Sequence, residues 1–378
     1  MIDTFFQVKI DILPDKLSQH ASLIGILPII LICGMITSCD RTQIQDNLPL
    51  KKHHTSTGFT NIEIENPHHG FKDFLKWQMN KPDTRPKYND VTGTFPIVNP
   101  DFSHYNSDDS FFSTTWLGHA TLLLHMEGKT IITDPIFSER CSPFQWAGPK
   151  RFTPFPISQD ILPTIDVVLI SHNHYDHLDK STVLKLGNSP KWLVPLGLKA
   201  WFESLGITNV VELDWWDEFQ FDGFTFACTP TQHFSGRGFG DRFKTLWCSW
   251  AVLGKRARFW FAGDTGYFSR FRTIGEKYGP FDLSAIPIGA YEPRWFMNPM
   301  HVTPDQAVMI HQDIHSRQSI GIHWGTFILT DEPITEPLVL LQEAIDKHHL
   351  SPKEFVTLKH GETRTFPIYD KSADSVNE

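Results

Sequence analysis

The chain has 378 residues, of which 40% are hydrophobic and 20% charged, a composition typical of a globular protein with a sizeable core. The formal net charge of −9 excludes a general nucleic-acid binder, because such a protein needs a basic excess to displace counterions from phosphates. Cys141, Cys228 and Cys248 have no CxxC spacing, so they indicate neither a zinc ribbon nor a disulfide framework, and a single disulfide stays open.

The first 39 residues carry a signal for membrane attachment. Residues 21–38 contain no charged side chain, a length between the apolar region of a signal peptide and a minimal membrane span. The run ends in Ile36-Thr37-Ser38-Cys39, which resembles a bacterial lipobox. We therefore expect residues 1–39 to be a signal peptide with lipid attachment at Cys39 in the cell envelope. A signal anchor and a buried core helix are the alternatives.

Two segments precede the main domain. Residues 40–70 are polar and lack periodicity, which predicts a linker with solvated histidines. From residue 71 to 111, several prolines interrupt any long helix, and we expect a cap that packs on the main domain through residues such as Trp77 and Lys87. The main domain would then span residues 112–378.

Regular patterning begins at residue 112. Apolar and β-branched runs bounded by Gly and Pro predict strands at 113–117, 120–124, 130–133, 166–170, 191–194, 209–213, 224–229, 246–253, 258–262, 283–287 and 319–322. Helices are predicted at 180–186, 198–205 and 303–316, with Thr303 as the N-cap of the last. Several strands are followed by His or Asp, which indicates a site built along one edge of packed sheets.

The segment Ser171–His177 follows the apolar run 166–170 directly. It places three imidazoles and one carboxylate within six consecutive residues, His172 to His177. Nitrogen and oxygen donors at this density, directly after a buried strand, are typical of a metal site. A His-rich surface loop is the alternative.

A larger set of potential ligands follows the predicted strands. Its five imidazoles and two carboxylates are His172, His174, Asp176, His177, His233, Asp264 and His323. These donors suit zinc first, with iron or manganese as alternatives. Two ions that each keep a position open for water need about this many ligands, whereas one ion would leave buried titratable groups unpaired. We therefore predict a two-metal site.

The spacing of these residues resembles that of the metallo-β-lactamase superfamily. The motifs are His172–His177, His233, Gly263–Gly266 and Ile322–Gly325. Further motifs are similar to those of the N-acylphosphatidylethanolamine-hydrolysing phospholipase D family, namely Trp116–Thr121, Thr133–Phe137, Gly148–Phe152, Leu246-Trp247 and Pro287–Met297. The likeness covers roughly residues 70 to 365, and the stretch from Gly289 to Met297 is what narrows it to that family.

This resemblance implies an α/β fold, the αβ/βα sandwich of two mixed sheets flanked by helices, with two Zn²⁺ ions. His172, His174 and His233 would hold the first zinc. Asp176, His177 and His323 would hold the second, and Asp264 would bridge them. Two such ions produce a metal-bound hydroxide near neutral pH and clamp a phosphate. Asp176 and Asp264 thereby become catalytic candidates.

The resemblance also implies contacts with the substrate. Tyr175 and His301 match family positions that touch the phospholipid, and Gln145 and Trp146 match a segment beside the metals. His301 could orient the phosphate or protonate the leaving oxygen. Its alternative is a histidine at a helix entry, and the alternative for Trp146 is a core residue. The family further suggests a homodimer.

The expected function is a membrane-attached zinc phosphodiesterase of the phospholipase D type. It would convert N-acylphosphatidylethanolamine at a membrane surface to an N-acylethanolamine and phosphatidic acid. Fold alone does not determine the substrate, so a hydrolase of a lactone or of a soluble phosphodiester is an alternative. A non-catalytic, metal-containing lipid-binding protein is another.

Overall fold

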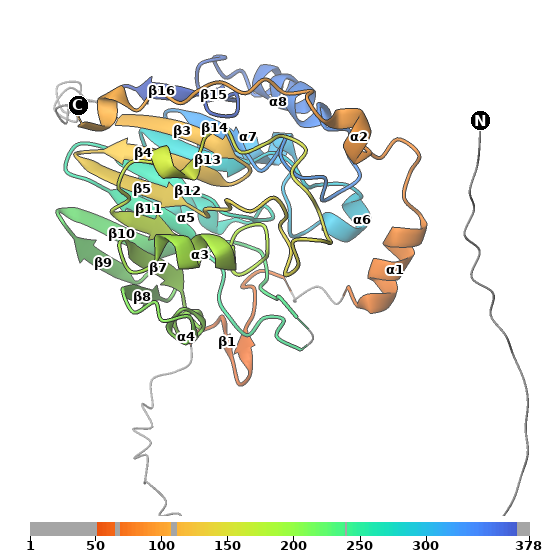
Figure 1. Cartoon of the computed structure of the whole chain (residues 1–378), viewed down its shortest axis with the longest axis horizontal. Helices are drawn as coiled ribbons and strands as arrows, with labels where there is room; N and C mark the ends of the chain where they lie inside the picture. The colour runs from red at the N-terminus through yellow and green to blue at the C-terminus, as the bar shows by residue number, and fades with distance from the viewer. Residues whose placement is uncertain (1–50, 65–68, 107–111, 239, 369–378) are drawn as a thin grey trace, which may run out of the picture. The chain divides into compact units, whose positions relative to one another are not determined.

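The computed structural model describes residues 51–64, 69–106, 112–238 and 240–368 (Figure 1). These residues belong to the unit Leu50–Glu378, and the other unit, Met1–Pro49, lies outside the described residues. The predicted attachment segment 1–39 therefore lies outside them too. Within the described part of the chain, no helix has both the length and the apolar character needed to cross a membrane.

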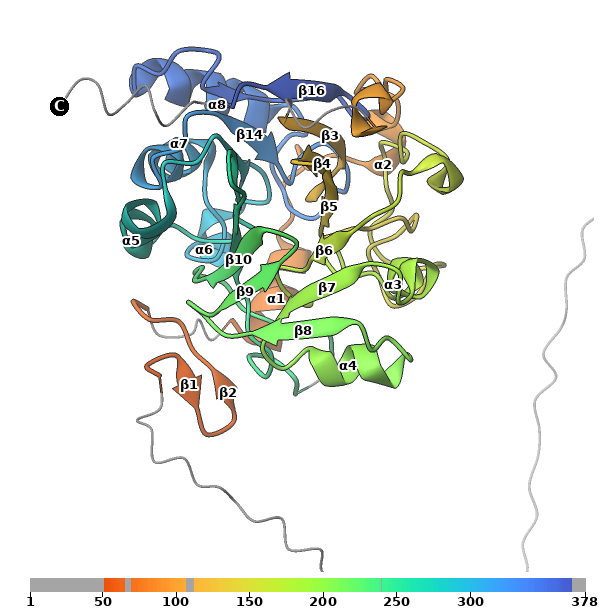
Figure 2. The same ribbon diagram turned by 90° about the vertical axis from the view of Figure 1, so that its left-hand side faces the viewer.

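Two seven-stranded sheets form the centre of the domain (Figures 1 and 2). The first has the order β16-β3-β4-β5-β6-β7-β8, with β3 Phe112–Gly118, β4 Thr121–Met126, β5 Lys129–Thr133, β6 Val167–Leu169, β7 Lys191–Pro195, β8 Val210–Leu213 and β16 Thr363–Phe366. The second has the order β15-β14-β13-β12-β11-β10-β9, with β9 Glu218–Phe221, β10 Phe224–Thr229, β11 Ser249–Leu253, β12 Arg258–Phe261, β13 Leu283–Pro287, β14 Ser319–Ile322 and β15 Phe355–Val356.

Both sheets combine antiparallel and parallel pairing in the same pattern. From β16 to β8, three antiparallel pairings precede three parallel ones. From β9 to β15, the same succession occurs. Parallel strands need covered faces because they are buried on both sides, and helices supply that cover here. The predicted sandwich of two mixed sheets is confirmed.

Side chains of the first sheet alternate between two hydrophobic clusters. Leu122 and Leu124 of β4 face the core between the sheets, whereas Leu123 packs on the outer face. Helices α3 (Lys180–Leu186) and α4 (Lys199–Ser204) cover that outer face through Val183 and Phe202. The three described cysteines are free and buried in this apolar interior.

Helices α5 (Arg270–Tyr278), α7 (Pro304–Asp313) and α8 (Glu336–Lys347) pack on the second sheet through Phe271, Val308 and Leu341. Figure 2 shows them on the side opposite to α3 and α4. Thr303 is the N-cap of α7, as predicted, since its hydroxyl accepts a hydrogen bond from the backbone of Gln306 at 3.3 Å.

The segment before the first sheet is more ordered than the sequence indicates. It contains β1 (His54–Thr55), β2 (Gly58–Phe59), α1 (Phe71–Met79) and α2 (Tyr88–Val91). The expectation of a solvated linker is wrong for His53, which is 4% exposed and places Nε2 2.6 Å from Asp214 Oδ1. The polar residues around His53 predict exposure to solvent, whereas its burial depends on the carboxylate of Asp214, which is distant in sequence. Trp77 packs on the domain as expected and donates to Asp331 at 2.6 Å.

One predicted strand begins later than expected. The run 246–253 forms β11 only from Ser249. Leu246 and Cys248 instead donate their backbone hydrogen bonds to Leu196 and Ser171, two residues in loops of the first sheet. These bonds bring the second sheet against the loop that carries the predicted metal ligands.

Candidate metal centre

The predicted metal ligands come from loops that follow strands of both sheets. His172 to His177 follow β6, and His233 follows β10. Asp264 and His323 follow β12 and β14, which are parallel to β13 between them. The carboxyl ends of neighbouring parallel strands share one edge of a sheet, so the loops after them meet. The structure brings all seven predicted ligands into one cluster, in which His174 and Asp176 are half-buried and the other five are buried.

One group consists of His172, His174 and His233. Nε2 of His172 lies 2.9 Å from Nδ1 of His174, and Nε2 of His233 lies 3.3 Å from that same atom. Tetrahedral zinc with bonds of about 2.0–2.1 Å holds its nitrogen ligands about 3.3 Å apart. The three nitrogens therefore converge as the ligands of one ion do.

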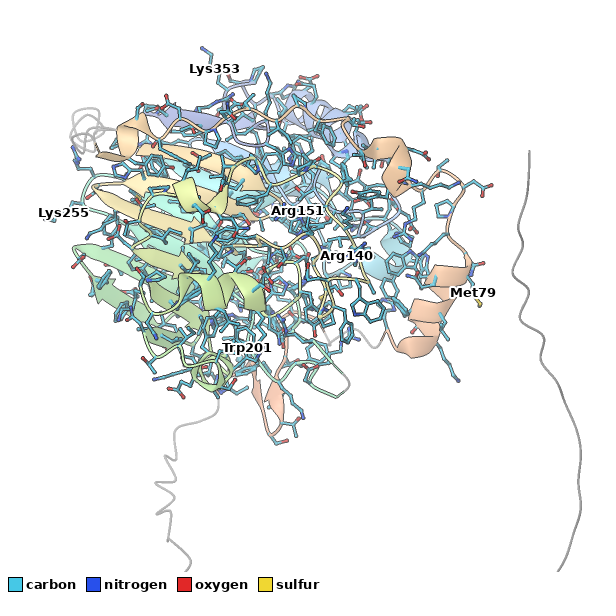
Figure 3. The ribbon with its side chains drawn as sticks, viewed as in Figure 1. Met79, Arg140, Arg151, Trp201, Lys255 and Lys353 are labelled. Atoms are coloured by element: carbon cyan, nitrogen blue, oxygen red, sulfur yellow. The ribbon has the colours of Figure 1, made fainter. Side chains whose placement is uncertain are left out.

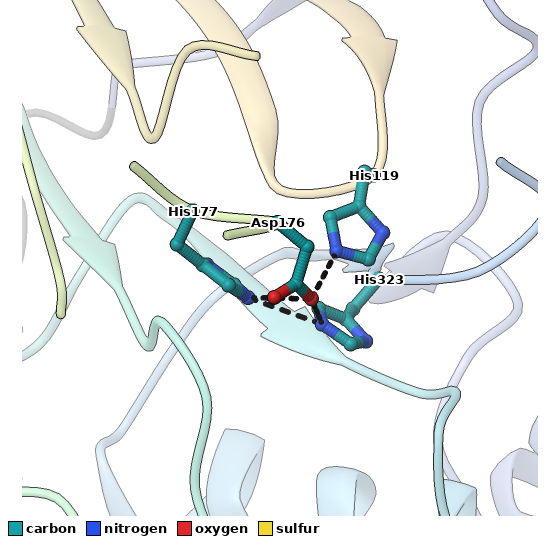
Figure 4. Close-up of side chains that lie close together, drawn as sticks. All are labelled: His119, Asp176, His177 and His323. Carbon is teal, nitrogen blue, oxygen red and sulfur yellow. Dashed lines mark hydrogen bonds and ion pairs between the residues drawn. The ribbon is translucent and has the colours of Figure 1, made fainter. Parts of the chain in front are cut away.

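The second group consists of Asp176, His177 and His323, and it includes His119 as a fourth member (Figure 4). Asp176 Oδ2 lies 3.4 Å from Nε2 of His177 and 3.3 Å from Nε2 of His323. His119 Nε2 approaches the same oxygen at 2.9 Å. His119 lies in the hairpin between β3 and β4 and was absent from the predicted set.

Asp264 lies between the two groups. Its Oδ2 is 3.2 Å from Nε2 of His177 and 3.8 Å from Nε2 of His233, while its Oδ1 is 3.2 Å from Nε2 of His323. Burial raises the pKa of this carboxyl, but the attraction of His177 and His323 outweighs burial and holds the pKa well below its usual range. Asp264 is thus an ionised carboxylate that reaches members of both groups.

A glycine allows Asp264 to approach the ligand loop. Gly263 has a φ of +61°, a backbone conformation that favours glycine, and a Cβ there would lie 2.5 Å from Cβ of Ser171. A larger residue would push apart the two loops that carry the ligands.

The second ring nitrogens of three imidazoles have fixed partners. His177 Nδ1 lies 2.6 Å from Asp134 Oδ2, His172 Nδ1 lies 2.9 Å from Ser171 Oγ, and His233 Nδ1 lies 3.0 Å from the carbonyl of Met300. Such partners orient metal-binding histidines and select the ring nitrogen that faces the ion. The donor set, its convergence and these supporting bonds all fit a metal centre.

Burial favours the neutral, metal-binding form of several imidazoles. It lowers the pKa of His174 to about 4 and lowers the pKa of His172 and His233 well below the usual value. His323 differs: burial alone lowers its pKa, but Asp264 and Asp176 raise it to about 9. Because metals bind deprotonated ligands, an ion displaces the proton that these carboxylates would otherwise favour on His323.

A cavity of about 450 Å³ opens beside this cluster. Metal-ligand candidates His174, Asp176, Asp264 and His323 line one part of it. The remaining lining consists largely of aromatic, aliphatic and methionine side chains, including Phe74, Trp77, Phe234, Phe296, Met297, Met300 and Leu329. The centre therefore faces a space that a partly apolar molecule could enter.

Two of the four predicted substrate contacts lie at this cavity. Tyr175 and His301 both line it, and His301 Nδ1 is 3.9 Å from Asp264 Oδ2. Gln145 and Trp146 do not line it. The amide of Gln145 instead bonds the backbone of Arg140 within its own loop, and Trp146 is 79% exposed, so it is not a core residue either.

Two residues that complete the cluster were missed as individual candidates. His119 and Asp134 each follow a buried strand, β3 and β5, as the predicted ligands do. The same sequence signal could have identified both. Each occurs within a motif of the resemblance, but neither was given a role there.

Comparisons with known proteins agree with this geometry. A model of the beta-lactamase superfamily domain matches residues 129–324. The N-acyl-phosphatidylethanolamine-hydrolyzing phospholipase D 1 of Caenorhabditis elegans is 45% identical over 287 residues, which are 72% of this chain and 80% of that protein. The mitochondrial N-acyl-phosphatidylethanolamine-hydrolyzing phospholipase D of Saccharomyces cerevisiae is 38% identical over 232 residues, 59% of this chain and 49% of that protein.

Among solved structures, an isothiocyanate hydrolase from Delia radicum gut bacteria matches with a TM-score of 0.56 and 21% identity, covering 68% of this chain and 100% of that chain. That likeness shows the fold alone. Sequence identity, fold and the ligand cluster together lead to one conclusion. The chain is a metal-dependent hydrolase that belongs to the metallo-β-lactamase superfamily and, within it, to the family of N-acylphosphatidylethanolamine-hydrolysing phospholipases D.

Proposed function

We propose that this protein is a dinuclear zinc phosphodiesterase that hydrolyses N-acylphosphatidylethanolamine to an N-acylethanolamine and phosphatidic acid. The observation that carries the proposal is the cavity, which combines metal-ligand candidates with an apolar wall. A phospholipid has the same division, since its anionic phosphodiester joins long acyl chains. Ligand sites are commonly apolar pockets with a few well-placed polar groups.

The residues divide into metal-binding and substrate-facing roles. His172, His174 and His233 would hold one ion, Asp176, His177 and His323 the other, and Asp264 would bridge both. Two zinc ions in such a site activate a water molecule and offset charge on the phosphate oxygens. His301 lines the cavity within 3.9 Å of Asp264, a place from which it can orient the phosphate.

The reaction adds water across one phosphodiester bond. The water oxygen becomes bonded to phosphorus, and the bond between phosphorus and the oxygen of the N-acylethanolamine breaks. One proton of the water passes to that leaving oxygen, which gives the alcohol. The other product is phosphatidic acid, and no oxidant or second substrate is required.

Exposed apolar side chains near the cavity support a membrane-bound substrate. Phe74 lines the cavity and is 42% exposed, and Met79 on the same helix is 78% exposed. Figure 3 shows Met79 projecting from α1 away from the sheets. Trp295, on α6 (Arg294–Met297), is 46% exposed. We propose that the surface formed by Phe74, Met79 and Trp295 contacts the membrane. We also propose that Cys39 carries a lipid anchor.

The test is hydrolysis of N-acylphosphatidylethanolamine in vesicles by the full chain. We expect the unmodified chain to release N-acylethanolamine and to contain close to two zinc ions. We expect the Asp264→Asn variant to lose the hydrolytic activity and the bound zinc. Asp160→Asn serves as the control, because this exposed carboxylate is 3.3 Å from Lys185 and belongs to no ligand group. One zinc or none per chain contradicts the dinuclear centre.

Other results favour the other functions. Hydrolysis of soluble phosphodiesters or lactones without hydrolysis of the lipid would replace the proposed substrate. Metal binding without hydrolysis of any ester would favour a lipid-binding role. Membrane attachment is tested separately, since Cys39→Ser should release the chain from membranes if the lipid is its tether, and unchanged attachment favours a signal anchor.

A further inference from the structure

The side chain of Asn61 forms a pair of hydrogen bonds with the backbone of the ligand candidate His233. The amide nitrogen of Asn61 donates to the carbonyl of His233 at 3.0 Å. The backbone N–H of His233 donates to the amide oxygen of Asn61 at 3.1 Å. Asn61 is only 5% exposed, and 172 residues separate the two partners.

Asn61 belongs to residues 51–64, which we call the N-terminal strap. Asp214 fixes the start of the strap: its two carboxylate oxygens lie 2.6 Å from Nε2 of His53 and 2.9 Å from Nε2 of His54. Lys51 adds an ion pair to the same carboxylate at 2.9 Å. The ring of His53 also stacks on Trp215, with 4.3 Å between ring centroids.

The rest of the strap is attached to loops near the metal centre. The backbone N–H of Phe59 donates to the carbonyl of Phe243 at 2.8 Å, and the Phe59 side chain is buried in the main core. A Cβ at Gly58 would lie 2.2 Å from that same carbonyl oxygen, so glycine permits this approach. Beyond Asn61, Glu63 accepts a hydrogen bond from the backbone of Ser269 at 3.0 Å. The strap is thus fixed on both sides of Asn61.

The backbone of His233 needs such a partner because it lies beyond the end of β10, where none of the described strands pairs with it. A buried peptide group that lacks a hydrogen bond is costly. The amide of Asn61 offers one donor and one acceptor, as a neighbouring strand would. Met300 meanwhile holds only the ring of His233, through its carbonyl at 3.0 Å.

We propose that Asn61 is a positioning residue for the metal ion that His172, His174 and His233 would hold. Asn61 belongs to no ligand group and does not line the cavity, so it would act by fixing the backbone from which His233 extends. The tolerance for ligand distances in a metal site is about 0.2 Å. Loss of partners behind a ligand typically weakens metal affinity about 10–100-fold. The inference rests on the proposed two-metal centre, although its test needs no substrate.

The experiment measures zinc affinity of the full chain by competition with a chromogenic chelator. His177→Ala removes a ligand of one ion, so that zinc binding in this background reports the ion held by His172, His174 and His233. His174→Ala removes a ligand of that ion, so that zinc binding reports the other one. In the first background, Asn61→Ala should weaken zinc binding about 10–100-fold. In the second background, Asn61→Ala should change zinc affinity less than twofold.

A matched control separates positioning from general stability. Asn209 also joins distant backbone segments through its amide, which donates to the carbonyls of Pro190 and Asn188 at 2.8 and 3.3 Å, but it belongs to no ligand group. Asn209→Ala should leave both zinc affinities unchanged. Equal loss at both sites in Asn61→Ala, or loss at neither, overturns the proposal.

A second variant tests the strap if Asn61→Ala does not fold. Asp214→Asn weakens the attachment of His53, His54 and Lys51 while leaving Asn61 in place. It should lower the zinc affinity measured in the His177→Ala background and leave the zinc affinity in the His174→Ala background unchanged. An equal loss of affinity in both backgrounds, or a loss in neither, again contradicts the proposal. If the unmodified chain binds a single zinc, the dinuclear function fails while the effect of Asn61 on that ion is still measurable.

Discussion

Asp134 Oδ2 lies 2.6 Å from Nδ1 of His177, and neither side chain is exposed to solvent. The same carboxylate accepts two hydrogen bonds from Ser171, one from its backbone N–H at 2.7 Å and one from its hydroxyl at 2.5 Å. Ser171 in turn contacts Nδ1 of His172 at 2.9 Å. One buried carboxylate therefore supports histidines of both ligand groups.

We expect Asp134→Asn to weaken zinc binding by about 10–100-fold, because this carboxylate is an outer partner of the ligands. Asp134 now accepts hydrogen bonds from three donor groups. The NH₂ group of an asparagine would face one of these donors and could not accept its hydrogen bond. Chelator competition measures the change. Asp166→Asn is the control, because Asp166 also accepts a backbone hydrogen bond, from Thr130 at 2.9 Å, but lies outside the cluster. Wild-type affinity in Asp134→Asn would contradict this role.

His119 should contribute to the site that contains Asp176. Its Nε2 lies 2.9 Å from Asp176 Oδ2, and its backbone has a φ of +54°. Asparagine tolerates that conformation better than alanine. We expect His119→Asn and His119→Ala to weaken zinc binding alike, by about tenfold or more. The alanine variant should also melt at a lower temperature. Unchanged zinc affinity in both variants would exclude the role of His119.

Arg242 should recognise the anionic group of the substrate. Among the described residues that line the cavity, it is the one Lys or Arg, and its guanidinium lies 4.6 Å from the ring centre of Phe234. Hydrogen bonds to charged groups contribute about 1.5–3 kcal/mol. Arg242→Met should therefore lower kcat/KM for the phospholipid about 10–100-fold.

Arg140→Met is the control for Arg242. Arg140 lies on the exposed loop that holds Gln145 and does not line the cavity. Steady-state kinetics on mixed micelles would measure both variants, and thermal melting would show whether each is folded. Equal kcat/KM in Arg242→Met and in the unmodified chain would contradict recognition by this guanidinium.

The exposed face of α1 should bind membranes. Leu75 and Met79 lie four residues apart, on the same side of the helix, and are 41% and 78% exposed. Burying one such side chain is worth about 1.5–3 kcal/mol. In a Cys39→Ser background, the double variant Leu75→Ser/Met79→Ser should bind phospholipid vesicles at least about tenfold more weakly in sedimentation. Leu184→Ser on α3, where Leu184 is 51% exposed, should bind as before. An equal loss of vesicle binding in the α1 double variant and in Leu184→Ser would argue against a membrane-binding face on α1.

His311 should make the metal-free protein less stable in acid. It is 3% exposed, contacts Ser319 Oγ at 2.8 Å, and burial lowers its pKa to about 4. The unfolded chain binds this proton near pH 6.5, so the stabilisation is present above pH 6.5 and is lost as the pH falls through about 4. The full effect is roughly 3 kcal/mol.

Urea unfolding of the metal-free chain at several pH values tests that prediction. The stability of His311→Gln should fall less steeply between pH 6.5 and 4 than that of the unmodified chain. The difference between the two chains isolates His311, because the other histidines are common to both. Parallel curves would contradict the proposed linkage.

Most strands of the two sheets, and the residues that gather in the candidate metal centre, could be predicted from the sequence because both have local signatures. The alternation seen in Leu122–Leu124 and the apolar run before His172 report burial and strand ends directly. A predicted ligand such as Asp264 likewise lies in the loop directly after its strand, β12. The parallel arrangement then brings such strand ends together, and this is why residues predicted separately form one cluster.

The remaining features depend on partners that are distant in sequence. Nothing near Asn61 indicates that its amide meets His233, and nothing near His53 indicates the carboxylate of Asp214. The exposed position of Trp146 was equally hidden, because it depends on how the loop around Arg140 folds on itself. Local polarity predicted a linker where the native contacts are long-range.

The two sheets contribute different ligand candidates to the same cluster. His172 and His177 follow a strand of the first sheet, whereas Asp264 and His323 follow strands of the second. An ion held by such a group would therefore act as a cross-link between the two halves of the domain. Ligands that bind only the folded state add to its free energy of unfolding. Metal occupancy should thus govern how long the chain survives in the cell as well as whether it catalyses a reaction.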